Sequence, residues 1–273
     1  MRLRPRRADL TAWSAQSSPD VAATLFRLDG RIALVTGSAR GLGLEMAAAL
    51  ASAGATVLVN SRDPSKAEEI VAEFRGVGQK GEALAFDPAD ETATIAALEK
   101  VRARHGRIDI LVANAAARMR RPFEDIPPKD FARLIDTNLL AVQSLCWHAL
   151  PLLKAAPVGR IILISSVAAQ RASPNDAAYA TSKAGIEALM RALAVEYGPL
   201  GVTCNAIAPG PFLTEVNQKI AADIGDAIRH KVPVGRFAQP RELAGALLFL
   251  ASEAASFVNG QVLVVDGGAA AAL

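Results

Sequence analysis

A tyrosine and a lysine stand at a spacing suited to acid–base chemistry in the segment Tyr179-Ala-Thr-Ser-Lys183. Residues four apart lie on one face of a helix, about one turn from each other, so the ammonium group can sit beside the phenol. An unperturbed tyrosine has a pKa of about 10, and a neighbouring cation favours the phenolate, which predicts a lowered pKa for Tyr179. Taken alone, the same spacing also fits two solvated side chains on a helix surface.

Two further polar residues are candidates for the same site. Ser166 follows a run over residues 160–164 that reads as a buried strand. Ligands bind at the carboxyl ends of strands in open α/β sheets, so this hydroxyl is expected at a ligand site. Asn138 lies in the interior of a long predicted helix, where a buried asparagine could also merely satisfy its neighbours.

A glycine-rich turn joins a predicted strand over residues 32–37 to an apolar helix over residues 42–54. The turn reads Thr36-Gly37-Ser38-Ala39-Arg40-Gly41-Leu42-Gly43. Glycines let the backbone turn sharply and approach a pyrophosphate, which then lies on the helix amino terminus, where unpaired N–H groups point outward. The strand–turn–helix pattern therefore predicts a dinucleotide site.

The rest of the chain continues this alternation of strands and helices. Further strands are expected over residues 55–60, 82–86, 109–117, 202–210 and 261–268, and helices over residues 89–105 and 240–252. The sequence thus predicts an α/β fold, a single-domain Rossmann-type doubly wound parallel sheet of about seven strands with helices on both faces.

Composition suits one large domain, because the chain has 273 residues, of which 51% are hydrophobic and 21% charged. We assign residues 28–273 to that domain and residues 1–27 to an N-terminal extension that is expected to be disordered. Residues 1–28 hold five arginines and two aspartates, which leaves 25 basic and 25 acidic residues beyond. The extension could bind nucleic acid or serve in targeting, but no apolar export stretch follows Arg6-Arg7, and the neutral body predicts no nucleic-acid partner.

The two cysteines and the hydropathy of the chain indicate the cellular compartment in which the protein is expected. Cys146 and Cys204 are isolated and lack metal-ligand spacing, so buried thiols, no metal site and a reducing, cytoplasmic compartment are expected. A run of about 18 uncharged apolar residues is missing, so no membrane partner is predicted.

Taken together and in this order, the motifs resemble those of the classical short-chain dehydrogenase/reductase family. The matches are TGxxxGxG at residues 36–43, Ser166 with twelve residues before Tyr179-x-x-x-Lys183, and Pro209-Gly210 with Thr214 after it. One departure stands at residues 113–116, where the family's Asn-Asn-Ala-Gly reads Ala-Asn-Ala-Ala and Ala116 adds a methyl group. The resemblance covers residues 28 to about 268 and is closest to gluconate 5-dehydrogenase-like members.

The resemblance implies an NAD(P)-dependent enzyme that transfers a hydride between nicotinamide and a ketone or secondary alcohol. Tyr179 would donate or remove the proton, and Lys183 would lower its pKa and hold the nicotinamide ribose. Ser166 would polarise the carbonyl, and Asn138 would hold a water that resupplies the proton. Cofactor contacts are implied for Gly37, Ser38, Arg40, Gly41, Leu42, Gly43, Ser61, Arg62, Asp87, Asn114, Tyr179, Lys183, Pro209, Gly210 and Thr214.

The choice of cofactor depends on the end of the second predicted strand. NAD-preferring members of the family usually carry an aspartate that chelates the adenosine ribose, at the position that Ser61 occupies here. Arg62 and Arg40 could flank a 2′-phosphate, so NADP(H) is favoured over NAD(H). The alternative is that Arg62 is solvated and Asp63 holds the ribose.

Arginines near the predicted mouth bear on the substrate. Arg118 is expected to point inward, with Arg120 and Arg121 solvated, and Arg171 lies in the loop before Tyr179. Inward arginines, Arg118 and Arg171 above all, would capture an anion such as the carboxylate of gluconate or 5-ketogluconate. The alternatives are a 3-oxoacyl-[acyl-carrier-protein or CoA] reductase and a non-catalytic NADP-binding sensor. Residues 211–233 are a predicted lid, and family members suggest a homodimer or homotetramer.

Overall fold

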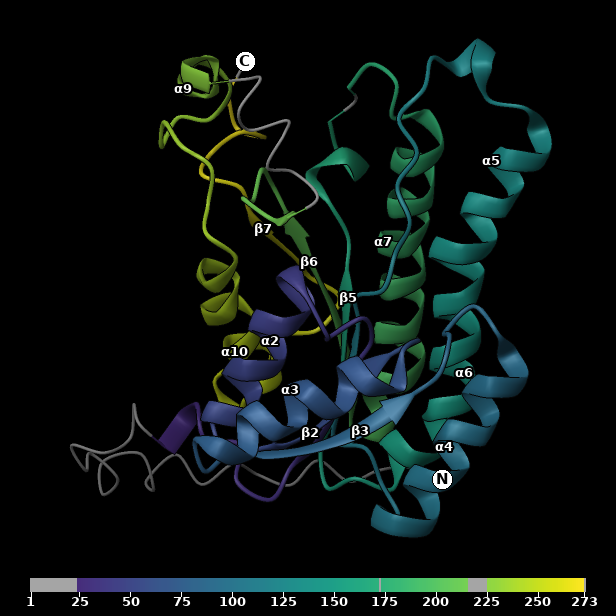
Figure 1. Ribbon diagram of the computed structural model, residues 1–273, viewed down its shortest axis with the longest axis vertical. Helices are drawn as coiled ribbons and strands as arrows, with labels where there is room; N and C mark the ends of the chain where they lie inside the picture. The colour runs from purple at the N-terminus through teal and green to yellow at the C-terminus, as the bar shows by residue number, and fades with distance from the viewer. Residues whose placement is uncertain (1–23, 172, 216–224, 273) are drawn as a thin grey trace.

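A seven-stranded parallel sheet forms the centre of the computed structural model, which describes residues 24–171, 173–215 and 225–272 (Figure 1). The strands lie in the order β3-β2-β1-β4-β5-β6-β7, and each neighbouring pair is parallel. Their bounds are β1 Ile32–Val35, β2 Thr56–Ser61, β3 Lys80–Ala85, β4 Ile110–Ala113, β5 Gly159–Ile164, β6 Val202–Pro209 and β7 Val262–Val265. The predicted fold class is confirmed.

β1 and β4 are continuous apolar runs, and β5 is apolar beyond the buried Arg160, because both faces of the sheet are covered. Every residue of β1, β4 and β5 is buried, as expected for parallel strands between two helical layers. Val35 of β1 pairs with Val59 of β2 on one side and Val112 of β4 on the other. The strand order therefore reverses between β1 and β4, and this switch point is where an open α/β sheet binds its ligand.

Helices cover both faces of the sheet (Figure 1). The longer ones are α2 Gly41–Ser52, α3 Pro64–Gly76, α4 Glu91–His105, α6 Ala141–Lys154, α7 Ala177–Tyr197 and α10 Ala244–Ala251. One core cluster joins the sheet to α4, α6 and α7 through Leu98, Leu145 and Met190. The other joins it to α2, α3 and α10 through Met46 and Leu247, among others.

The helix predicted around Asn138 is a composite element. It begins with α5 Pro128–Ile135, passes through a π-helical turn at Asp136–Leu140 and continues as α6. Asn138 lies inside the π-turn and is fully buried. A π-turn inside an α-helix often accompanies a functional position, because it rotates one side chain out of the regular α-helical register.

Three predicted segments, the strand over residues 109–117, the N-terminal extension and the lid, are compared with the structure in turn. The strand predicted over residues 109–117 ends at Ala113, so the segment after it is free to form a loop at the carboxyl edge. The N-terminal extension falls mostly on residues 1–23, outside the described residues, whereas Leu28 is already buried. Nine residues in the middle of the predicted lid, 216–224, also lie outside them, and α9 Ile228–Lys231 follows.

Candidate active site

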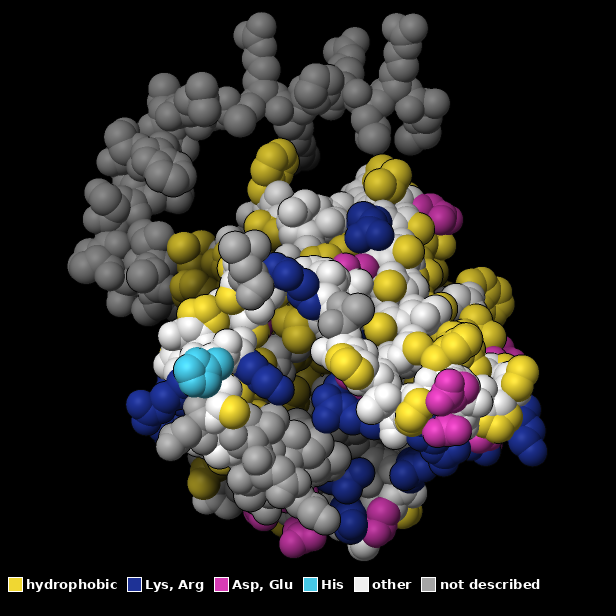
Figure 2. All heavy atoms as spheres, turned by 90° about the horizontal axis from the view of Figure 1, so that it is seen from above, with side chains coloured by type: hydrophobic (Ala, Val, Ile, Leu, Met, Phe, Trp, Pro, Cys, Tyr) yellow, Lys and Arg dark blue, Asp and Glu magenta, His cyan; other side chains and the backbone are white. Residues whose placement is uncertain are grey.

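The predicted site residues gather at the carboxyl edge of the sheet. Gly37 follows β1, Asn114 follows β4, Ser166 follows β5, and Pro209 ends β6. Figure 2 views this edge from above and shows Lys and Arg side chains spread across it. Residues far apart in the chain are thus brought to one edge because parallel strands all end on the same side.

The glycine turn between β1 and α2 has the form of a phosphate cradle. Gly37 and Gly41 adopt left-handed backbone angles, φ +64° and +56°. A Cβ atom at Gly43 would lie 2.7 Å from Asn114 Nδ2 and closer still to the Gly37 carbonyl, so only glycine fits there. Arg40 caps α2 without a side-chain hydrogen bond, which leaves the first-turn amides for an anion. The residues present therefore fit a dinucleotide pyrophosphate.

Asn60, at the end of β2, holds this turn in place and was not singled out by the sequence. It is buried, its Oδ1 accepts from Gly37 N (3.0 Å), and its Nδ2 donates to the Leu84 and Phe86 carbonyls (3.1 and 3.0 Å). Ser38 is also directed inward, because its hydroxyl accepts from Asn60 N at 2.8 Å. A polar residue closing a buried strand was the available signal.

Asn114 supports the turn from the other side of the switch point. Its Nδ2 donates to the carbonyls of Thr36 (2.9 Å) and Gly37 (3.3 Å), and its own N–H donates to Thr36 Oγ1 at 2.9 Å. Ala116, which replaces the family's glycine, is exposed. Its backbone φ is not positive; among the described non-glycine residues only Asn175 has a positive φ. The alanine is therefore accommodated without backbone strain.

The adenosine end of the predicted cofactor site lies beyond β2 and β3. Arg62 is 75% exposed and forms a loose 3.9 Å ion pair with Asp87. Asp63 caps α3, since its Oδ1 accepts from Ser65 N at 3.0 Å and from Ser65 Oγ at 2.7 Å. The carboxylate of Asp63 is engaged in capping, whereas the guanidinium of Arg62 is accessible.

Tyr179 and Lys183 lie on one face of α7, with Lys183 Nζ 5.7 Å from the centre of the tyrosine ring. Lys183 is buried, its ammonium donates to the Ile164 carbonyl at 2.7 Å, and burial lowers its pKa to about 8. Burial also raises the pKa of Tyr179, more than Arg118 and a hydrogen bond with Ser166 lower it. The predicted lowering of the Tyr179 pKa is therefore wrong here, because desolvation of the phenolate outweighs the nearby cations.

Asn138 is tied to both neighbouring segments. Its Oδ1 accepts from Ala117 N at 2.8 Å, and its Nδ2 donates to the Ala117 carbonyl (2.9 Å) and to Ser182 Oγ (3.1 Å). Ser182 in turn donates to the Tyr179 carbonyl at 2.7 Å. Asn138 thereby joins the loop after β4 to α7, next to the residues of the Tyr-x-x-x-Lys motif.

The arginines at the mouth differ in their partners. Arg118 contacts the buried Asp176 at 2.6 Å and lies over the Tyr179 ring, with its guanidinium carbon 4.7 Å from the ring centre. Arg120, which was expected to be solvated, also contacts Asp176, at 3.4 Å. Arg171 donates to the Ala270 and Ala272 carbonyls near the C-terminus. Asp176 is the residue that the sequence did not flag here, because its partners lie 56 and 58 positions away.

The loop after β6 closes the site. Gly210 N donates to the Val265 carbonyl at 2.9 Å, and Pro209 pairs with Val265 in the sheet register, so the turn is held by β7. Thr214 is half-buried, four residues beyond Gly210. The turn is thus fixed at the carboxyl edge, as the Pro-Gly motif predicts.

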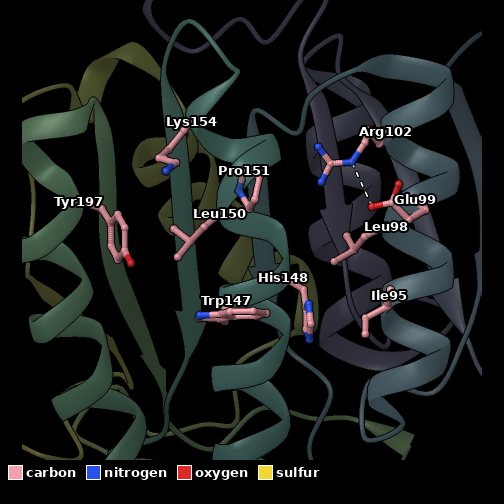
Figure 3. A pocket seen from close by; sticks show the side chains of 10 residues that line it. All are labelled: Ile95, Leu98, Glu99, Arg102, Trp147, His148, Leu150, Pro151, Lys154 and Tyr197. Atoms are coloured by element: carbon pink, nitrogen blue, oxygen red, sulfur yellow. Dashed lines mark hydrogen bonds and ion pairs between the residues drawn. The ribbon is translucent and has the colours of Figure 1, made fainter.

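A hollow of about 340 Å³ lies away from this edge, between α4, α6 and α7. Figure 3 shows Trp147 and His148 of α6 facing it, with Ile95 and Leu98 from α4 and Tyr197 from α7. Trp147 is 62% exposed, which is unusual for so large an apolar side chain. Within the described residues, no helix is long and apolar enough to cross a membrane, and no group of three or more His, Cys, Asp or Glu could hold a metal.

Comparison with known proteins gives consistent matches over the described region. A family model described as enoyl-(acyl carrier protein) reductase matches residues 37–270. Gluconate 5-dehydrogenase of Gluconobacter oxydans is 39% identical over 258 residues, 92% of this chain and 98% of that protein. The crystal structure of a gluconate 5-dehydrogenase from Burkholderia cenocepacia, in complex with NADP and tartrate, has a TM-score of 0.89 at 40% identity, covering 92% of this chain and 100% of that chain. A 3-oxoacyl-[acyl-carrier-protein] reductase of Escherichia coli is 35% identical over 240 residues, 88% of this chain and 97% of that protein.

Proposed function

The chain belongs to the short-chain dehydrogenase/reductase family, and we propose that it uses NADP(H) and a sugar-acid substrate such as gluconate or 5-ketogluconate. As a member of this family it is an oxidoreductase that acts on alcohol and ketone groups. The nicotinamide supplies or accepts the hydride when bound. The observation that carries the substrate proposal is the Arg118 guanidinium, 4.7 Å from the ring centre of Tyr179.

Charge at the mouth supports an anionic substrate. Arg118 and Arg120 share the single carboxylate of Asp176, so this cluster keeps a net charge of about +1 at neutral pH. A carboxylate bound by a partly buried guanidinium gains more than one bound at a fully exposed arginine. Tartrate, which the similar Burkholderia structure contains, is itself a hydroxy acid with carboxylates.

The proposed roles of the chain's own residues follow from their positions. Tyr179 gives a proton to the carbonyl oxygen in reduction or takes one from the hydroxyl in oxidation. Ser166, whose hydrogen bond lowers the Tyr179 pKa, polarises the same oxygen. Lys183 holds the nicotinamide ribose, and Asn138 holds the segments around the site and a proton-supplying water.

The NADP preference is supported at the adenosine end. Arg62 is exposed and only loosely paired, while Asp63 is occupied in capping α3. Ser61 offers no carboxylate to a ribose diol, and its hydroxyl accepts from Asp63 N at 3.1 Å. These contacts favour a 2′-phosphate over a free 2′-hydroxyl, with Arg40 as a second cation.

A substrate screen tests the proposal. NADPH oxidation is followed by absorbance with keto acids, ketosugars and acyl thioesters, in the wild type and in Tyr179→Phe. We expect turnover of keto acids and a loss of about 10²- to 10⁴-fold in the variant, the usual contribution of a general acid or base. Turnover of acyl thioesters alone would instead assign the 3-oxoacyl-thioester reductase, and NADPH binding without oxidation of any class would assign the sensor.

We further propose that the chain forms a homodimer or homotetramer through the apolar helices around residues 139–153 and 184–195, largely in α6 and α7. The hollow there and the exposed Trp147 are features that a second copy would cover. Light scattering on the wild type and on Trp147→Glu tests this, with the variant expected to dissociate.

Cys146 and Cys204 are both buried and free, which supports the cytoplasmic location proposed from the sequence.

A further inference from the structure

Asp176 is a buried carboxylate whose position is unusual for its residue type. It directly precedes α7 as the N-cap residue, where aspartate normally accepts a hydrogen bond from the first helical turn. Its side chain makes no such bond. The carboxylate instead accepts hydrogen bonds from Arg118 Nη2 at 2.6 Å and Arg120 Nε at 3.4 Å. Since Asp176 is 2% exposed, these two arginines are the groups that compensate its buried charge.

The ion pair fixes Arg118 against Tyr179. A backbone hydrogen bond from Arg121 N to the Asn175 carbonyl, 3.0 Å long, fastens the segment carrying Arg118 beside the start of α7. The guanidinium carbon lies 4.7 Å from the centre of the Tyr179 ring, within the range of a cation–π contact. Arg118 is therefore held on the ring of the acid–base residue by two contacts between its own segment and residues 175–176 at the start of α7.

We propose that Arg118 and Asp176 are positioning residues for Tyr179: Arg118 stabilises the phenolate through the ring contact, and Asp176 holds Arg118 there while offsetting part of its charge. This inference rests on the assignment of Tyr179 as the acid–base group in the proposed function. It gives Arg118 a role that is independent of the charge of the substrate.

The charged groups around the phenol act in opposite directions. After burial, which raises the pKa of Tyr179, the charge of Arg118 has the largest effect and lowers it. The carboxylate of Asp176 raises the same pKa, and Arg120 lowers it less than Arg118 does. Arg118→Gln should therefore raise the pKa of Tyr179. Asp176→Asn removes the negative charge but keeps an oxygen that can accept from Arg118, so it should lower the same pKa, and a purely structural role for the pair would not produce opposite shifts.

The other neighbours of the ring leave Arg118 as the dominant cation. Lys183, on the same helix, lies 5.7 Å from the ring centre, and its ammonium donates to a backbone carbonyl. On the side of α5, Tyr179 packs against the apolar cluster of Ile126, Leu134 and Ala178. The uncharged hydroxyl of Ser166 contributes a hydrogen bond that lowers the pKa of Tyr179.

The chain allows a direct titration, because it contains two tyrosines. In a Tyr197→Phe background, tyrosinate absorbance reports Tyr179 alone, with no substrate needed. We expect Arg118→Gln to raise the midpoint by about 0.5 to 1 pH unit and Asp176→Asn to lower it, while Arg118→Lys stays near the parent. Arg121→Gln is the matched control, because Arg121 pairs with Asp130 and should leave the midpoint unchanged.

A second measurement covers variants that unfold at high pH, as judged by circular dichroism. The pH profile of kcat/KM on a neutral ketone should move in the same directions as the titration. An unchanged midpoint and profile in Arg118→Gln, with only KM for keto acids raised, would overturn the inference and leave the proposed function standing. Movement of Arg118→Gln and Asp176→Asn in the same direction would also overturn it. Opposite movement in the titration without turnover of any carbonyl compound would support the inference and remove the proposed function.

Discussion

Replacing Arg62 by alanine should weaken the binding of NADPH and leave that of NADH nearly unchanged. In the structure the Arg62 guanidinium is 75% exposed and its ion pair with Asp87 is 3.9 Å long. An ion pair between two exposed side chains contributes at most about 1 kcal/mol. Arg62 can therefore turn to a 2′-phosphate at small cost, and its loss should leave the unfolding free energy almost unchanged.

The magnitude follows from these two interactions. A hydrogen bond to a charged group contributes about 1.5 to 3 kcal/mol, from which about 0.5 kcal/mol, the middle of the range for exposed ion pairs, is subtracted for the pair with Asp87 that NADPH displaces. The net loss of about 1 to 2.5 kcal/mol corresponds to a Kd for NADPH raised roughly fivefold to seventyfold. NADH lacks the phosphate, so its Kd should change by less than about twofold.

Isothermal titration calorimetry with both cofactors measures the effect on the wild type and the variant. Arg102→Ala on α4 is the matched control, because Arg102 is a half-exposed arginine that pairs with Glu99 far from the carboxyl edge. Equal weakening of NADPH and NADH in Arg62→Ala would mean that Arg62 only supports the loop after β2. The reasoning from the loose ion pair would then be refuted.

Three other perturbations test the structure around the site. Asn60→Ala leaves the Gly37 N–H and the Leu84 and Phe86 carbonyls without their partner, so urea unfolding should show a stability lower by about 2 to 4 kcal/mol. Gly43→Ala forces a Cβ atom against Asn114 and the Gly37 carbonyl, so it should weaken the binding of both NADPH and NADH at least about tenfold. Gly245→Ala is the control, because Gly245 has open space around it and the substitution should leave cofactor binding unchanged. Lys183 has its pKa lowered to about 8 from the ordinary 10.5, so between these values the unfolded chain binds a proton that the folded chain does not. The free energy of unfolding of the wild type should accordingly include a contribution from Lys183 that rises as pH increases from about 8 to 10.5, and Lys183→Met should lack this contribution. An identical pH dependence of the unfolding free energy in the two proteins would contradict the prediction.

Much of the fold could be predicted from the sequence because its signals are local. Apolar runs of strand length, the glycine turn before an apolar helix and the Tyr-x-x-x-Lys spacing each depend on a few neighbouring residues. Parallel strands then bring their carboxyl ends to one edge, so Gly37, Asn114, Ser166 and Pro209 meet there in the structure. The order of motifs along the chain was sufficient for the fold class.

What the sequence could not determine are the contacts between segments far apart in the chain. Asp176 and Arg118 are 58 positions apart, and neither residue type predicts that the carboxylate turns away from its helix to hold the arginine. The same limit explains the wrong expectation for the Tyr179 pKa, since a spacing of four residues reports a nearby cation but not how deeply the phenol is buried. Desolvation and ion pairing depend on everything that packs around a group, and only the tertiary structure decides that.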